Sequence, residues 1–206
     1  MKSKIAVVEG KWFKTSNVSV SELFNLVSDI YYDSPHHYYY EMFTNDSALH
    51  SIIENISANK KLKYLHVGAH GSSTSIESSG GTITRAKFRN ALRDLKHGSI
   101  RGMFIDSCSF TSTHNARFFL KVSGAPTPIT WLAGFGTDVD FVASSTFVML
   151  FWTTLLQQNP STNELPKIIA VAKEIKRLAP GLCSELDFHI FVRQRGRGTT
   201  VEDLMS

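Results

Sequence analysis

Short apolar runs alternate with amphipathic segments along nearly all of this 206-residue sequence. Apolar runs of about four to eight residues predict buried strands, and apolar residues that recur every three or four positions predict helices packed against them. The alternation is typical of an α/β fold in which helices cover both faces of a mostly parallel sheet. Strands are expected at 4–8, 36–43, 63–69, 101–108, 129–135 and 187–194, with a small β-hairpin at 72–84.

Six helices are expected between these strands, and several have recognisable end signals. Ser19 or Ser21 could cap the first helix, Asn45 or Asp46 the second, and Thr84 the third. Gly181 is expected to mark the end of the last helix. The expected helices span 19–30, 45–56, 85–95, about 113–122, 139–158 and 165–179.

Length and composition favour one globular domain over residues 1–206. The net charge of +4 is scattered, and only residues 193–198 are locally basic, so no nucleic-acid partner is expected. The longest apolar-rich run, 147–156, is too short to cross a membrane. The first residues lack the apolar stretch of a signal peptide, so a cytoplasmic protein with reduced Cys108 and Cys183 is expected.

Two of the predicted strands lead into reactive side chains. His70 and Gly71 follow the strand at 63–69, and Cys108 closes the strand at 101–108. Functional groups of an open α/β sheet collect at the carboxyl ends of its strands, and neighbouring strands lie about 5 Å apart. An imidazole and a thiol at such ends can work together as base and nucleophile. The backbone N–H groups of Gly71 and Cys108 could then stabilise an oxyanion.

At these positions the sequence resembles the caspase-like cysteine peptidases. An apolar strand that ends in His-Gly precedes one that ends in Asp-Ser-Cys, and "FIDSCS" at 104–109 is similar to the corresponding segment of metacaspases. Residues 131–156 resemble the strand, acidic loop and long helix of small bacterial caspase-like and CHAT-type peptidases. The resemblance implies a caspase-like sandwich, a His70–Cys108 dyad, Gly71 as an oxyanion donor and Asp106 in the pocket for the residue before the cut.

The predicted substrate preference follows from acidic residues around Cys108. Asp106 lies two positions before the cysteine, so its side chain is expected on the same face, about 7 Å away, bordering the pocket beside the thiol. A carboxylate there favours Arg or Lys before the scissile bond. Asp138 or Asp140 could supply a second carboxylate, although either could instead cap the following helix. Arg193, Arg195 and Arg197 would be self-cleavage points.

Other interpretations remain open from the sequence. A catalytically inactive caspase-like module that binds a partner would keep the same strands, and a nucleotide-sensing α/β domain has less support. No cofactor is expected, and no metal site, because His66 and His70 lie about 13 Å apart on one strand. Stand-alone bacterial relatives of this kind resemble parts of antiviral defence or cell-death systems, which implies control by a regulatory protein partner. Dimerisation through residues 187–194 would require that strand to be an edge.

Overall fold

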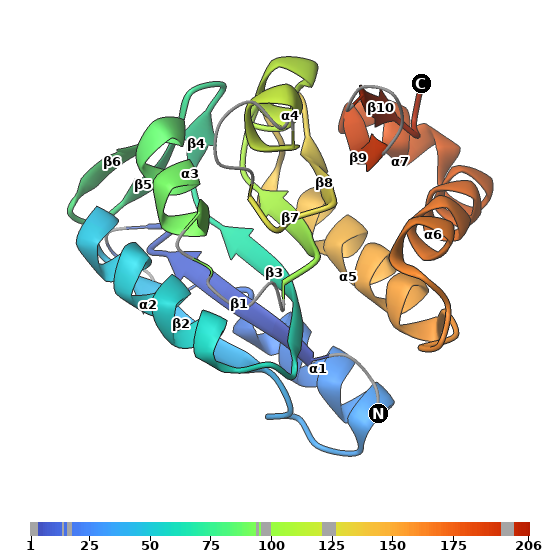
Figure 1. The fold of residues 1–206 in the computed structure, drawn as a ribbon, viewed down its shortest axis with the longest axis horizontal. Coiled ribbons are helices and arrows are strands. Elements are labelled where there is room, and N and C mark those ends of the chain that lie inside the picture. Colours follow the sequence, from blue (N-terminus) through green and yellow to red (C-terminus); the bar gives the residue numbers. More distant parts are fainter. Residues whose placement is uncertain are drawn as a thin grey trace.

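A seven-stranded sheet forms the centre of the computed structural model, which describes residues 4–13, 15, 18–93, 95, 100–120, 127–194 and 200–206 (Figure 1). The strand order is β10-β9-β8-β7-β3-β1-β2. The five strands β8, β7, β3, β1 and β2 run parallel to one another, whereas β9 pairs antiparallel with β8 and β10 antiparallel with β9. The predicted α/β class is therefore confirmed. The strands are β1 (Lys4–Gly10), β2 (Tyr39–Phe43), β3 (Leu62–Gly68), β7 (Gly102–Asp106), β8 (Trp131–Phe135), β9 (Phe188–Gln194) and β10 (Thr200–Asp203).

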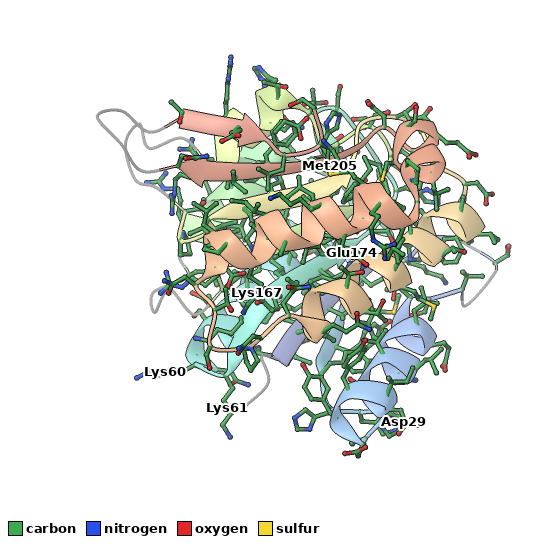
Figure 2. The ribbon with its side chains drawn as sticks, turned by 90° about the vertical axis from the view of Figure 1, so that its right-hand side faces the viewer. Asp29, Lys60, Lys61, Lys167, Glu174 and Met205 are labelled. Carbon is green, nitrogen blue, oxygen red and sulfur yellow. The ribbon has the colours of Figure 1, made fainter. Side chains whose placement is uncertain are left out.

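Helices cover both faces of this sheet, and each face buries its own apolar cluster. Helices α2 (Asp46–Ala58), α3 (Arg85–Arg93) and α4 (Thr113–Leu120) pack on one face. The opposite face is covered by α1 (Ser21–Tyr32), α5 (Phe141–Gln157), α6 (Glu164–Leu178) and α7 (Pro180–Glu185). Figure 2 shows α6 lying along this second face, with Lys167 and Glu174 labelled on it. This layering is compatible with a caspase-like sandwich.

The connection between β3 and β7 carries a second, smaller sheet. Its strands β4 (Gly71–Ser72), β5 (Ser75–Ser78) and β6 (Gly81–Thr84) pair antiparallel in the order β4-β5-β6, and α3 follows directly. The expected hairpin is confirmed, with its turn at residues 79 and 80. This crossover leads from β3 to β7, and the two strands pair in parallel. The segment after β3 therefore lies next to the segment after β7.

Some helix boundaries differ from the sequence prediction. Asn45 caps α2 as expected, since its side chain accepts a hydrogen bond from the Ala48 N–H. The prediction for α1 is correct only in part: its N-cap is Val20, without a side-chain cap, but the Ser19 hydroxyl accepts from the Ser21 N–H at 3.0 Å. The same hydroxyl also donates to the buried carboxylate of Glu9. Gly181 does not end the preceding helix either. It lies inside α7, which begins at the adjacent proline, a residue well suited to a first helical turn.

The C-terminal edge of the sheet also differs from the prediction. Strand β9 is not an edge, because β10 pairs with it antiparallel from Thr200 to Asp203. The proposed dimerisation through residues 187–194 therefore loses its free strand edge, and β10 takes that position. Arg195 and Arg197, two of the expected self-cleavage points, lie outside the described residues. In the described part of the chain, no helix is both long and apolar enough to span a lipid bilayer.

Candidate active site

The His-Gly and Ser-Cys segments lie side by side at the carboxyl end of the sheet. Strands β3 and β7 are parallel neighbours, with Gly68 opposite Asp106. The pairing continues one residue further, where the Ala69 N–H donates to the Asp106 carbonyl oxygen at 3.1 Å. His70 follows Ala69 directly, and Cys108 lies two positions beyond Asp106. The sheet therefore brings the predicted base and nucleophile to the carboxyl ends of two neighbouring strands, as the sequence pattern indicates.

Gly71 is fixed at a position that accepts only glycine. A Cβ atom at residue 71 would lie 2.2 Å from Oγ of Ser107 and 2.7 Å from the carbonyl oxygen of Ser75. Both distances are far inside van der Waals contact. The close approach of Gly71 to Ser107 also shows that the chain after His70 passes directly beside the residue that precedes Cys108.

Cys108 begins a sharp turn that is held by the loop after β8. The residue that follows it, Ser109, has a φ of 55°, in the left-handed region that few non-glycine residues adopt. This conformation is stabilised by hydrogen bonds from the Ser109 N–H to the Thr137 carbonyl at 2.8 Å and from its Oγ to Asp138 at 2.7 Å. Such a conformation is typical of positions where the surrounding structure aims a neighbouring side chain.

The Cys108 thiol is half-buried and contacts backbone rather than His70. Its Sγ lies 3.8 Å from the carbonyl oxygen of Val139, within reach of a weak S–H hydrogen bond. The thiol is free, because neither described cysteine forms a disulfide. In this arrangement the thiol can donate its proton to the Val139 carbonyl oxygen.

Two aromatic residues from the chain after β1 pack against His70. The imidazole is half-buried, and its ring meets those of Trp12 and Phe13 edge-on, with centroid separations of 5.4 and 5.5 Å. Trp12 is buried, whereas Phe13 is 42% exposed. The sequence interpretation missed both residues, because no local pattern links a tryptophan after the first strand to a histidine after the third.

The side chain of Asp106 is buried, which corrects the expectation of an open pocket beside the thiol. Only 1% of Asp106 is exposed, and neither carboxyl oxygen has a hydrogen-bond partner. Burial, and to a smaller degree the nearby charge of Glu9, raises the pKa of Asp106 to about 7. A buried carboxyl without partners is costly and is found mainly at functional positions.

His66 faces this carboxyl from the neighbouring strand. The Trp152 indole N–H donates to Nδ1 of His66 at 3.3 Å, which leaves the imidazole proton on Nε2. That Nε2 lies 3.8 Å from Oδ2 of Asp106, too far for a direct hydrogen bond. Complete burial lowers the pKa of His66 to about 3, so the imidazole is neutral.

Glu9 is a second buried carboxylate near Asp106, and it is fully hydrogen-bonded. Oε1 accepts from the Trp12 indole N–H and from the Val20 N–H, and Oε2 accepts from the hydroxyls of Ser19 and Tyr40. These donors compensate the burial of the charge. The sequence reading missed Glu9, although an acidic residue near the end of the first parallel strand falls at the same sheet edge as His70.

The other predicted carboxylates take two different positions in the loop before α5. Asp140 is the N-cap of α5 and accepts from the Val142 and Ala143 N–H groups at 2.9 and 3.1 Å, which is the capping alternative that the sequence left open. Asp138 is exposed and accepts a hydrogen bond from Ser109 in the turn after Cys108. Of the two aspartates, Asp138 is therefore the one that is hydrogen-bonded to the residue directly after the candidate nucleophile.

Further chemistry-bearing residues form a second cluster beside Gly136, the residue that follows β8. Cys183 lines a cavity of about 550 Å³ together with His189, Asp187 and Asp203. His189 is held there between the two carboxylates, at 2.7 Å from Asp203 and 3.3 Å from Asp187. Among the described residues, no group of three or more His, Cys, Asp or Glu side chains is placed to hold a metal ion.

The sequence was compared with models of known protein families and with curated proteins. No family model matches the chain, and no curated protein is significantly similar to it. The assignment of a function therefore depends on the chemistry of the site itself.

Proposed function

We propose that this protein is a cysteine endopeptidase with His70 as general base and Cys108 as nucleophile. The observation that carries the proposal is the contact between the two chain segments: Ala69 pairs with Asp106, and Gly71 abuts Ser107. The positions of the imidazole and the thiol at the ends of adjacent parallel strands support this proposal, because side chains at such ends can come within the reach that nucleophilic catalysis requires.

The proposed reaction proceeds through a thioester. His70 removes the proton of the Cys108 thiol, and the sulfur attacks the carbonyl carbon of the scissile peptide bond. The N–H groups of Gly71 and Cys108 stabilise the oxyanion. The C–N bond then breaks, the amine leaves with the proton from His70, and water hydrolyses the thioester to release the acid and regenerate the thiol.

The proposed substrates are proteins cleaved after Arg or Lys. Asp106 supplies the negative charge that would select a cationic side chain, and its unpartnered oxygens support this role because a guanidinium would give them donors. Asp138 is the proposed second carboxylate at the rim, whereas the bonds of Asp140 to the start of α5 favour a capping role for that residue. We place the enzyme in the cytoplasm, as an effector controlled by a partner protein.

A second candidate function is a catalytically inactive caspase-like interaction module. The observation that favours it is the hydrogen bond from the Cys108 thiol to Val139, together with the burial of Asp106. Both features describe a site that is closed as it stands. A module that never opens would keep this geometry permanently.

Labelling with a peptide electrophile that carries Arg next to its reactive group separates the two functions. The proposal predicts much faster labelling of Cys108 than of Cys183, whose pKa is raised by burial. It also predicts that His70→Ala slows the labelling of Cys108. This second result shows that Cys108 is activated by His70, whereas the comparison with Cys183 alone could reflect only a slow reaction at Cys183. Equal labelling of both cysteines, or no effect of His70→Ala, would favour the inactive module.

A further inference from the structure

Trp12 lies over Gly68, which is the cross-strand neighbour of the buried Asp106. A Cβ atom at Gly68 would lie 3.1 Å from Cζ2 of Trp12 and 3.6 Å from Nε2 of His66, so both rings border the position of Gly68 at the end of β3. Gly68 is paired with Asp106 on β7, and Nε2 of His66 faces the Asp106 carboxyl. The missing side chain of Gly68 thus leaves room for the indole beside this carboxyl.

Three contacts hold the indole in place. Its N–H donates to Oε1 of Glu9, and its ring packs edge-on against His70 at 5.4 Å and Phe141 at 5.3 Å. Only 9% of Trp12 is exposed. The same ring therefore touches the candidate base and covers the strand position next to Asp106.

The space that Trp12 occupies suits a cation better than an indole. Asp106 has no hydrogen-bond donor on either oxygen, and the indole offers its single N–H to Glu9 instead. A guanidinium in this space could donate to both carboxyl groups, because it carries five N–H donors in a planar fork.

Release of Trp12 would leave its surroundings largely intact. Glu9 keeps three of its four donors, namely Ser19, Val20 and Tyr40, when the indole N–H is withdrawn. An incoming guanidinium can replace the fourth. The exchange therefore removes one hydrogen bond and a set of ring contacts, and it supplies Asp106 with partners that it lacks.

We propose that Trp12 is a displaceable plug that closes a cation-binding pocket formed by Asp106 and Glu9, and that its removal opens the site to substrate. The identity of the pocket as the one for the residue before the cut rests on the proposed function. The plug itself does not, because it is defined by packing and charge. A plug at Trp12 explains why His70 and Cys108 follow neighbouring strands while the acidic pocket beside them is closed.

Benzamidine, an aromatic amidinium of about the same size as indole, is the probe for this pocket. Binding is measured by calorimetry on the full chain with Cys108→Ala, so that no turnover is involved. Adding Trp12→Ala should tighten binding by at least about tenfold, or about 1.4 kcal/mol. Phe13→Ala, which removes the neighbouring exposed aromatic ring, should leave the affinity within about twofold. Adding Asp106→Asn to Trp12→Ala should abolish the gain.

Neutral benzamide distinguishes a cation pocket from an empty apolar cavity. A mere cavity left by Trp12→Ala would bind benzamide as well as benzamidine, and that result would overturn the proposal. So would equal benzamidine affinity with and without Trp12, or a gain that survives Asp106→Asn. If Trp12→Ala does not unfold cooperatively, Trp12→Phe takes its place, since it removes the bond to Glu9 and part of the ring; it should show a smaller gain with the same dependence on Asp106.

This experiment separates the plug from the peptidase. Benzamidine binding that depends on Trp12 and Asp106, in a protein that never cleaves peptides, would refute the proposed function and leave the plug standing. Cleavage after Arg without any effect of Trp12 on benzamidine affinity would refute the plug alone.

Discussion

Nε2 of His66 lies 3.8 Å from Oδ2 of Asp106, and both side chains are almost completely buried. Neither the imidazole Nε2 nor the carboxyl oxygens have a hydrogen-bond partner. Burial lowers the pKa of His66 to about 3 and raises that of Asp106 to about 7. Near neutral pH the imidazole is therefore neutral, whereas the carboxyl is about half ionised, at an energetic cost to the fold that a substrate-binding role would explain.

Replacement of this carboxyl should stabilise the protein at alkaline pH. Because the folded-state pKa of Asp106 lies above its ordinary value, the native state holds the proton longer than the unfolded chain does. The contribution of Asp106 therefore lowers the free energy of unfolding progressively between about pH 4 and about pH 7, and this loss does not grow further at higher pH. Asp106→Asn should exceed the wild type in free energy of unfolding at pH 8 and lose this advantage near pH 4.

Urea unfolding of both proteins at pH 4, 6 and 8 checks this expectation. His66 affects the pH dependence in the opposite direction between about pH 3 and 6.5, since its pKa is lowered, but it is common to both proteins and cancels in the difference. A difference that does not change with pH would show that the carboxyl of Asp106 ionises normally.

Gly71→Ala should destabilise the protein and abolish catalysis. The new Cβ would meet Oγ of Ser107 and the carbonyl oxygen of Ser75, and the second of these is backbone that cannot rotate away. Overpacking of this kind costs about 1–3 kcal/mol. Gly181→Ala is the matched control, because a Cβ there meets nothing within 4 Å. Equal unfolding free energies for the two variants would contradict the close contact at Gly71.

The two loop aspartates should have separable roles. Asp140→Ala removes the cap of α5 and should lower the free energy of unfolding by about 1 kcal/mol. Asp138→Ala removes an exposed hydrogen bond to Ser109, in the turn after Cys108. This change should lower the rate of peptide cleavage and leave the free energy of unfolding nearly unchanged. Thermal unfolding and cleavage rates of both variants test this; the reverse pattern would assign the functional carboxylate to Asp140.

Much of the fold was accessible from the sequence, because it depends on local patterns. The apolar runs predicted the strands, and the Asn45 and Asp140 caps are local hydrogen bonds. The errors arose where a distant group competed. Ser19 was expected as a cap but is not the N-cap of α1 and also bonds to Glu9, and β10 covers the strand that was expected to be an edge.

The candidate site was accessible only in part. Strand order places His70 and Cys108 together, and parallel neighbours make that step predictable. The burial of Asp106 was not predictable, because Trp12 occupies the space left by the missing side chain of Gly68, the cross-strand neighbour of Asp106. Contacts of this kind depend on three-dimensional packing, which no short sequence motif records.

Peptides that differ only at the residue before the cut should reveal a strong preference for Arg. The negative charge of Asp106 favours a guanidinium and repels Asp and Glu. Arg cleavage should fall at least about tenfold in Asp106→Ala, a loss of about 1.4 kcal/mol or more. Preference of the wild type for Asp would overturn the assignment of this pocket.

The central claim is that His70 and Cys108 cleave proteins, and sequencing of new N-termini in a cellular protein mixture tests it most directly. The mixture also supplies partner proteins that the isolated chain lacks. Wild-type protein should generate N-termini that follow Arg or Lys. Cys183→Ser should do the same, and so should His114→Ala at an exposed position in the first turn of α4, since neither residue belongs to the dyad. Cys108→Ala and His70→Ala should generate none above background. The same set of new N-termini from wild type and Cys108→Ala, or none from either, would contradict the account.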